Sequence, residues 1–453
     1  MIAALGGIFT PTTFARTGSW QPGGDTLDVI LPESDRMELI LPHEPVQWSL
    51  DDCIGYARRN NISVLKSALN IEDSQIGLKE AKAALFPSLT ASTSQLLDIN
   101  NETDGDNAVY NSSYSLNAGM TLYNGGRNLK NIQQQKLAIE GSQFNYLATA
   151  NAVEISIIKA YYQVLYAHES VLTNQEILYA SQKQLERSRE LFDVGKISKV
   201  DLSQIESQYK GDIYQLVLAQ TTEAENILNL KQLLQLGENT LFEVLIPSIG
   251  EEETLAPVPD KNEVIQIALA TLPELKSAAT DIRIARLDEE IAKGERLPSI
   301  SLNASVGTGY TTITESNWGR QMKKGLGEQV GVTVSVPIFN NRQTKSKIEK
   351  SRVNILRNEL TLQDSQLEIS NTISAIHLDA ISSQSRFDAA LIQVEAARQS
   401  YELVSEKYDL GMLNVVDLLV EKNNLLNARQ EKIQAKYSSL LDLRLLQFYM
   451  TQQ

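Results

Sequence analysis

Two long stretches of the chain carry apolar residues at the spacing of coiled-coil helices. The first, 127–194, contains no proline and a single glycine, and its apolar residues recur in steps of seven at Val171, Leu178, Leu185 and Phe192. In the matching stretch of the second half, apolar residues between 369 and 408 recur in steps of three, four or seven. Such steps keep these side chains on one helical face that packs against another helix. At 1.5 Å per residue, each stretch predicts a helix roughly 100 Å long.

Both predicted helices end in the same kind of turn. The first turn reads "FDVGKISKVDL" and the second "YDLGMLNVVDLL", and they align with Gly195 on Gly411 and Asp201 on Asp417. Glycine commonly ends a helix, and aspartate is favoured as the N-cap of the next one. We therefore predict two helical hairpins, in which the glycines end the outgoing helices and the aspartates cap the returning ones.

The period of the pattern changes from helical to two after Pro87 and again after Pro298. Apolar residues then alternate with small polar ones, at 116–122 in the first half and at 300–306 and 330–336 in the second. This alternation predicts strands of about ten residues with one apolar and one small polar face. We expect β-hairpins over 88–123 and 299–339, each with a polar loop at its tip.

The order helix, strand, strand, long helix, helix occurs twice, so we predict two tandem structural repeats. The first covers 46–236, with its helical tip near 192–202, and the second covers 263–449, with its tip near 408–418. Three prolines lie in 237–262, which predicts a linker with one short strand at 241–246. We expect an extended segment at 1–45, whose mildly apolar start we interpret as the remnant of a secretory signal, and a short tail at 450–453.

The strands favour a membrane sheet, although a half-buried soluble sheet has the same alternation. The loops between strands alternate long and short, and aromatic residues stand at strand ends, as at membrane interfaces: Tyr110, Tyr114, Tyr123, Tyr310 and Phe339. The predicted helices extend away and cannot cover the apolar face. Four strands are also too few to close a barrel, so several identical chains must contribute.

Composition excludes several classes of function. A net charge of −15 without a dense basic stripe argues against a nucleic-acid partner. The single cysteine, Cys53, cannot form an internal disulfide, and the three histidines have no partner at metal-ligand spacing. We find no phosphate-binding loop and no nucleophile elbow. The sequence therefore predicts neither an enzyme nor a cofactor or metal site.

From about Val46 to Phe448 the chain resembles the TolC-like outer-membrane efflux protein family. The resemblance lies in the two tip turns, the strand exits "LYNGGR" and "IFNNR", and the prolines Pro87 and Pro298. It implies an α+β membrane protein of a Gram-negative bacterium. In the family, three chains form a twelve-stranded β-barrel, four strands per chain, continued by a long α-helical coiled-coil barrel across the periplasm. It also implies an exit duct for efflux or type I secretion, bound to a periplasmic adaptor and an inner-membrane transporter.

The resemblance implies a gate at the periplasmic helical tips. Asp417 and Asp201 would each form a ring of three carboxylates, in which like charges raise one another's pKa, and Tyr408 would hydrogen-bond across helices. The alternative is that both aspartates only cap helices. The chain departs from the family pattern at Val420, where a second carboxylate would reinforce the ring, and at Leu413, where a basic residue would hold the gate shut.

Further candidates lie at the turns and at the ends of the strands. Apolar residues are unusual at turns and indicate burial against a partner, here the adaptor. The docking candidates are Val194, Gly195, Lys196, Ile197, Leu410, Gly411, Met412 and Leu413. The candidate junctions between barrel and helices are Pro87, Tyr123, Gly125, Gly126, Pro298, Pro337 and Phe339.

A coiled-coil scaffold, soluble or attached to a surface, with a small β-domain and no pore is the alternative to the duct. Membrane fractionation separates the two hypotheses, because a scaffold needs no detergent. Within the duct class, efflux and protein secretion are both open. The transported substrate and the particular pump are chosen largely by other components.

Overall fold

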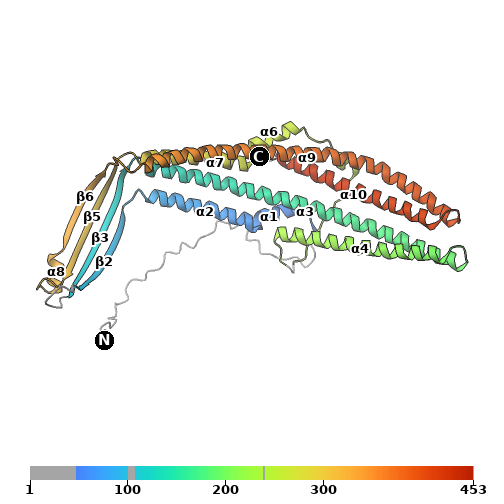
Figure 1. Cartoon of the computed structure of the whole chain (residues 1–453), viewed down its shortest axis with the longest axis horizontal. Helices are drawn as coiled ribbons and strands as arrows, with labels where there is room; N and C mark the ends of the chain where they lie inside the picture. Colours follow the sequence, from blue (N-terminus) through green and yellow to red (C-terminus); the bar gives the residue numbers. More distant parts are fainter. Residues whose placement is uncertain (1–46, 100–107, 238–239, 452–453) are drawn as a thin grey trace, which may run out of the picture. The chain divides into compact units, whose positions relative to one another are not determined.

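The computed structural model describes residues 47–99, 108–237 and 240–451. The extended segment and signal remnant expected at 1–45 therefore lie outside the described residues, as do the last two residues of the expected tail. The described part is mostly helical, with one four-stranded sheet and one pair of two-residue strands (Figure 1). Among the described helices, none combines the length and apolar character needed to cross a membrane.

In each half of the chain, two strands of the sheet are followed by a long helix and a returning helix. The first half contains β1 (Gln47–Trp48), α1 (Leu50–Asn60), α2 (Ile62–Ala83), β2 (Ser88–Ile99), β3 (Ala108–Asn124), α3 (Arg127–Asp193) and α4 (Lys199–Leu234). The remainder contains β4 (Glu243–Val244), α5 (Glu251–Thr254), α6 (Lys261–Thr271), α7 (Pro273–Gly294), β5 (Ser299–Thr311), α8 (Trp318–Lys324), β6 (Gly327–Ser335), α9 (Gln343–Asp409) and α10 (Val415–Thr451). The helices α3 and α9 have 67 residues each, so each is roughly 100 Å long.

Two segments contain elements that the sequence pattern did not predict. The polar loop expected between β5 and β6 contains α8, a helix of seven residues capped by Asn317. The expected linker contains the four-residue helix α5, and its strand covers only Glu243–Val244, which pairs in parallel with Gln47–Trp48. Elements this short contain too few residues for a periodic pattern to show.

The four-stranded sheet is antiparallel, with the strand order β2-β3-β5-β6. Its register aligns residues of one kind across all four strands. One row is apolar and consists of Leu89, Ala118, Ala304 and Val330, and the row beside it is polar and consists of Thr90, Asn117, Ser305 and Gln329. Directly opposed residues lie on the same face, so the sheet has one apolar and one polar face. The apolar face is largely exposed, with Val330 at 76%.

The helices form two antiparallel hairpins, which Figure 1 shows running alongside each other. In one, α3 packs against α4, and in the other α9 packs against α10; the hairpins meet where α10 contacts α3. Nearer the sheet, α7 lies between α3 and α9, and α2 packs on α3. The largest core cluster joins α1, α3, α4 and α10, and includes Cys53, Ile157, Leu230 and Phe448. Burial raises the pKa of the Cys53 thiol to about 12, so this thiol remains protonated.

Each long helix is entered from the sheet through two residues with left-handed backbone. Gly125 (φ +71°) and Gly126 (φ +75°) precede α3, and Asn341 (φ +51°) and Arg342 (φ +67°) precede α9. A Cβ on Gly125 would collide with the carbonyl oxygen of Gly294 in α7, whereas one on Gly126 would meet nothing within 4 Å. At position 126 only the left-handed backbone favours glycine. At position 125 glycine is also required because a side chain would collide with α7.

Candidate functional site

Both hairpin tips have the same hydrogen-bonded turn. Gly195 (φ +74°) and Gly411 (φ +76°) follow α3 and α9 in the left-handed conformation. At the first tip the Lys196 amide donates to the Leu191 carbonyl (2.8 Å), and at the second the Met412 amide donates to the Lys407 carbonyl (2.9 Å). These are Schellman motifs, which satisfy carbonyls that the end of a helix leaves without a partner.

The returning helices begin earlier than the sequence predicted. Ser198 is the N-cap of α4: its hydroxyl accepts from the Asp201 amide (3.1 Å), and the Asp201 carboxylate accepts from the Ser198 amide (3.1 Å). In α10 the Asp417 amide donates to the Asn414 side chain (2.9 Å). The prediction that Asp201 and Asp417 are N-caps is therefore wrong, because each lies three residues after the capping residue. The spacing "SKVD" is itself a capping-box signal that would have located the first cap.

The carboxylates of Asp201 and Asp417 have different surroundings. Asp201 is half-buried, and its carboxylate also accepts from the Ser198 hydroxyl (2.8 Å), so the capping box occupies it. Asp417 lies on the exposed side of the first turn of α10. Val420, one turn further on, is also exposed. Of the two candidate pore carboxylates, Asp417 is the one that faces solvent.

The predicted docking residues divide into exposed and inward-facing ones. Val194, Leu410 and Met412 are exposed, Leu410 at 75%. Ile197 instead packs against the tip cluster, and Leu413 is half-buried. The tip cluster consists of Leu185, Leu202, Ile205, Tyr408, Val415 and Leu418. It contains residues of α3, α4, α9 and α10, so it holds the two tips together.

Tyr408 lies inside this tip cluster. Its side chain is buried, and among the described residues its hydroxyl has no hydrogen-bond partner. The neighbouring Ser188 hydroxyl acts to lower the pKa of Tyr408, but it donates its hydrogen to the Gln184 carbonyl (2.8 Å). Burial raises the pKa of Tyr408, and the charges of Asp201 and Asp409 act in the same direction. The phenol is therefore neutral and retains an unused hydrogen-bond donor.

A buried polar cluster that the sequence analysis missed lies near the tips. Lys422 of α10 donates to both Asp212 of α4 and Ser181 of α3, and Ser181 also donates to Asp212. Gln208 donates to the other oxygen of Asp212 (2.9 Å). The exposed fractions of Lys422, Asp212 and Ser181 are 9%, 3% and 4%. Burial lowers the pKa of Lys422, and the bond to Asp212 opposes this shift.

The heptad pattern held a signal for this cluster. Lys422 stands between Leu418 and Leu425 in steps of four and three, so it occupies an apolar seam position. Ser181 stands between Leu178 and Leu185 with steps of three and four. A polar residue at a seam position either leaves a charge unpaired or faces a partner from another helix.

Further charge pairs continue along the contact between α3 and α10. Glu169 pairs with Lys436 (2.8 Å) and accepts from the Tyr437 hydroxyl (2.6 Å). Seven residues further along α3, Glu176 pairs with Arg429 (3.1 Å). Acidic residues of α3 thus face basic residues of α10 at a heptad step, which fixes the register between the two hairpins. These outer pairs are partly exposed, so each contributes little to stability.

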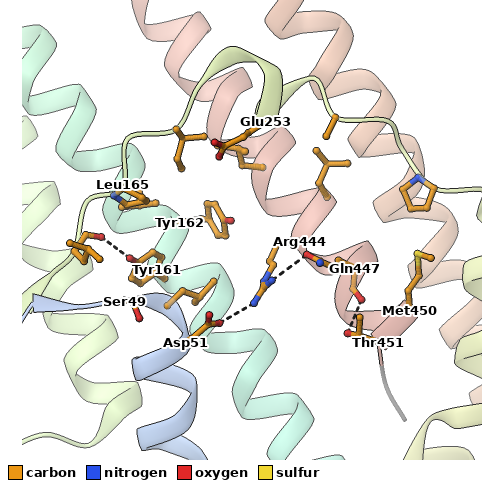
Figure 2. A pocket seen from close by; sticks show the side chains of 18 of the residues that line it. Ser49, Asp51, Tyr161, Tyr162, Leu165, Glu253, Arg444, Gln447, Met450 and Thr451 are labelled. Carbon is orange, nitrogen blue, oxygen red and sulfur yellow. Dashed lines mark hydrogen bonds and ion pairs between the residues drawn. The ribbon is translucent and has the colours of Figure 1, made fainter.

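A hollow of about 840 Å³ lies where α1, α3, α5 and the end of α10 meet (Figure 2). Figure 2 shows Tyr162, Glu253 and Met450 around it and Arg444 extending toward Asp51 (3.2 Å). The Tyr161 hydroxyl donates to the Leu245 carbonyl (2.6 Å). The described residues contain no group of His, Cys, Asp or Glu arranged to hold a metal. The Asp51 pair joins the beginning of α1 to the end of α10, so this region is a structural joint.

The predicted junction residues lie between the sheet and the helices. Pro87 and Pro298 each precede the first residue of a strand, and Pro337 follows β6 by two residues. Tyr123 lies beside a bulge in β3, where the register with β5 shifts between Thr121 and Tyr123. Tyr123 and Phe339 are both exposed. Exposed aromatic side chains therefore lie at the end of the sheet where the strands lead into the helices.

Comparison with known proteins decides the family. The profile of a family described as outer membrane efflux protein matches residues 53–235 and 264–450, which is most of the chain. The chain belongs to this outer membrane efflux protein family. The predicted resemblance and the expected location in the outer membrane are thereby confirmed, and the role of exit duct is confirmed at the level of the family.

Individual relatives of this outer membrane efflux protein are distant but cover most of its length. The outer membrane protein TolC of Escherichia coli is 24% identical over 402 residues, covering 85% of this chain and 78% of TolC. The alkaline protease secretion protein AprF of Pseudomonas aeruginosa is 23% identical over 351 residues, covering 76% of this chain and 70% of AprF. The solved CmeC outer membrane channel of Campylobacter jejuni has a TM-score of 0.72 at 18% identity, covering 88% of this chain and 85% of CmeC.

Proposed function

We propose that three copies of this chain form one passive duct through the outer membrane and the periplasm. Each copy contributes four strands to a twelve-stranded barrel, and the hairpins continue as a helical barrel. The observation that carries this proposal is the sheet itself. Its apolar face is exposed, and within the described residues β2 and β6 each have one edge without a neighbouring strand.

The free edges favour assembly through the sheet. In hydrocarbon, each unpaired backbone amide or carbonyl costs several kcal/mol, so an open sheet edge is not stable there. β6 is exposed along its whole length, and Val330, Val332 and Val334 extend from its apolar face. Pairing β6 of one copy with β2 of the next satisfies both edges and continues the apolar face around the barrel.

The helices carry a second surface for a neighbouring copy. Exposed apolar residues recur along α9, at Leu360, Leu367, Leu378 and Ile392. A row of exposed apolar side chains on a long helix indicates a contact with another protein surface. In a closed ring, this face of α9 packs against the hairpin of the next copy.

The gate lies at the six tips of the trimer in this proposal. Exposed Asp417 forms a ring of three carboxylates, and buried Tyr408 holds the hairpins together within each copy. Leu413 supplies no positive charge for a lock. The bonds of Lys422 to Asp212 and Ser181 connect the two hairpins a second time, further along the helices from the tip turns.

The tips are also the docking surface for a periplasmic adaptor, which links the duct to an inner-membrane transporter. Val194, Leu410 and Met412 are exposed apolar residues at turns, and Lys196 adds an exposed charge. The cargo is either a substance removed by efflux, as the family description indicates, or a secreted protein, as the name of AprF indicates.

Single-channel conductance in a planar bilayer tests the duct. The purified protein should run as a heat-modifiable trimer and show a cation-selective, mostly closed conductance. Replacing Asp417 by alanine should increase the open time, with exposed Asp388 replaced as the control. If no variant conducts, the duct is wrong and the coiled-coil scaffold without a pore is favoured.

A further inference from the structure

The helix α8 lies in the loop at the tip of the β5–β6 hairpin. Figure 1 shows it at the end of the sheet that points away from the long helices. It packs on β5 and begins at Trp318, directly after the capping residue Asn317. In the proposed duct, this end of the sheet is the end where the strands leave the membrane.

The inward side of α8 is held firmly. The side-chain Nε2 of Gln321 donates to the carbonyls of Thr311 (3.0 Å), Thr314 (3.2 Å) and Ser316 (2.7 Å), and its side-chain Oε1 accepts from the backbone amide of Thr311 (3.0 Å). The Thr308 hydroxyl donates to the Met322 carbonyl (2.7 Å). Gln321 and Met322 are accordingly only partly exposed. These bonds fix which side of the helix faces outward.

The exposed side chains of α8 comprise one aromatic ring and three cations. Trp318 precedes Gln321 and Met322 by three and four residues, so it lies on the same side of the helix as these two residues, and the cations lie on the opposite, outward side. Trp318 is 55% exposed, and Arg320, Lys323 and Lys324 are exposed as well. Within the described part of the chain, none of these three cations takes part in an ion pair. Of the neighbouring carboxylates in the sequence, Glu315 precedes the helix and Glu328 follows it as a residue of β6. The chain as a whole carries a net charge of −15, so this cluster is a local exception.

Aromatic residues mark the level at which α8 lies. Tyr110 and Tyr310 stand near the loop ends of β3 and β5 on the apolar face, with ring centroids 6.3 Å apart. Beyond them α8 adds Trp318 at the same end. Tyrosine and tryptophan gather at the boundary between hydrocarbon and headgroups, and lysine and arginine next to this boundary bind anionic headgroups.

We propose that α8 binds the phosphate-bearing headgroups of an anionic lipid surface. Arg320, Lys323 and Lys324 on its outward side bind the phosphates, and Trp318, on the side of the helix next to the sheet, enters the headgroup layer. The inference rests on the proposed function, because it requires the sheet to lie in a membrane. It adds a lipid contact that fixes the depth and rotation of the strands.

Fluorescence of Trp318 in reconstituted full-length protein tests the proposal. Replacing Trp20 and Trp48 by phenylalanine leaves Trp318 as the only tryptophan. Its emission should shift to shorter wavelength in vesicles of phosphatidylcholine with phosphatidylglycerol, compared with phosphatidylcholine alone. The variant R320Q/K323Q/K324Q should lose this difference, and high salt should reduce it. Trp48 packs against Tyr56 and Phe242, so a difference spectrum of the wild type and Trp318→Phe provides the same reading without changing that contact.

A matched control removes the same charge elsewhere. Lys66, Lys79 and Lys82 are exposed on α2, and the variant K66Q/K79Q/K82Q should keep the lipid-dependent shift. Equal loss in both triple variants would overturn the proposal, since net charge alone would then explain it. Millimolar inorganic phosphate added to phosphatidylcholine vesicles should not shift the emission; a full shift would show a site for free phosphate instead.

Two other outcomes distinguish a failure of the lipid contact from a failure of the proposed membrane sheet. A chain that enters neither kind of vesicle in a flotation assay refutes the membrane sheet and this inference with it. A chain that inserts, but whose Trp318 does not respond to anionic lipid, refutes this inference alone. If R320Q/K323Q/K324Q weakens the trimer equally in both lipids, the cations bind carboxylates of a second copy, and the lipid proposal is wrong.

Discussion

Lys422 of α10 and Asp212 of α4 form an ion pair that is almost entirely buried between the two helical hairpins. Removing one member of a buried pair leaves the other charge without compensation, which costs about 3–5 kcal/mol. Replacing both members by apolar residues of similar size avoids this cost. The pair therefore stabilises the structure only as a unit, together with Ser181.

We expect Lys422→Met to reduce the free energy of unfolding by about 3–5 kcal/mol, because Asp212 is then left buried and unpaired. The double variant K422M/D212L should recover most of the loss. Thermal unfolding of the purified protein measures both. Lys436→Met, at a partly exposed pair with Glu169, is the control and should cost about 1 kcal/mol or less. Equal effects of Lys422→Met and Lys436→Met would contradict the importance of burial.

Asp442 predicts a dependence of stability on pH. Burial raises the pKa of this carboxyl to about 6, against the opposing bond donated by Ser383 (3.2 Å). A raised folded pKa means that the folded state binds the proton more tightly than the unfolded chain, whose pKa is about 3.9. The resulting stabilisation is complete below about pH 4 and is lost as the pH rises through about 6.

Asp442→Asn should therefore raise the melting temperature at pH 7.5 and have little effect at pH 4. Differential scanning calorimetry at the two values measures the difference. Asp388→Asn, an exposed carboxylate on α9, should show no such difference between the two pH values. A stabilisation by Asp442→Asn that is as large at pH 4 as at pH 7.5 would exclude ionisation as the cause.

The two glycines before α3 offer a direct comparison of backbone and space. Both have left-handed backbone, which costs about 1–2 kcal/mol for any other residue. Gly126→Ala should lose about this amount, because its Cβ meets nothing within 4 Å. Gly125→Ala should lose clearly more, since its Cβ collides with the backbone of Gly294. The yield of heat-resistant trimer reports the difference; equal yields would show that α7 moves away at little cost.

Ser198 separates the two roles considered for Asp201. Ser198→Ala removes the hydroxyl that caps α4 and should cost about 1 kcal/mol, while it leaves the Asp201 carboxylate in place. Asp201→Asn should cost a similar amount. If Asp201 also lines the pore, only Asp201→Asn lowers the cation selectivity in planar bilayers. If both variants leave the selectivity unchanged, Asp201 acts as a capping residue alone.

The exposed apolar residues of the second tip test the docking of an adaptor. Leu410→Ser with Met412→Ser should reduce crosslinking to the adaptor and increase drug susceptibility, without lowering the melting temperature, because both side chains are exposed. Leu69→Ser on α2, also at an exposed apolar position, is the control. Unchanged crosslinking would place the adaptor contact elsewhere, for instance around Lys196.

The long helices and the sheet could be predicted because their patterns repeat many times. Seven-residue steps before Phe192 extend over several turns, and alternation at Leu116–Leu122 fixes which side of a strand is apolar. The caps were misplaced by three residues because aspartate is favoured both at the N-cap and in the first turn. Lys422 was missed because one polar residue scarcely alters an otherwise apolar seam, and its partner Asp212 lies 210 positions away.

The polar face of the sheet has a consequence for permeation. Across the four strands this face carries mainly serine, threonine, asparagine, glutamine and glycine. Leu96 and Val109 are apolar residues on it near the loop, and Asp98 is its one charge within the described strands. If this face lines the bore, water wets the wall while the wall exerts almost no electric field on a solute. Short side chains also keep the bore wide. Cations, anions and large neutral cargo then pass this section with equal ease, and discrimination among them falls to the opposite, periplasmic end.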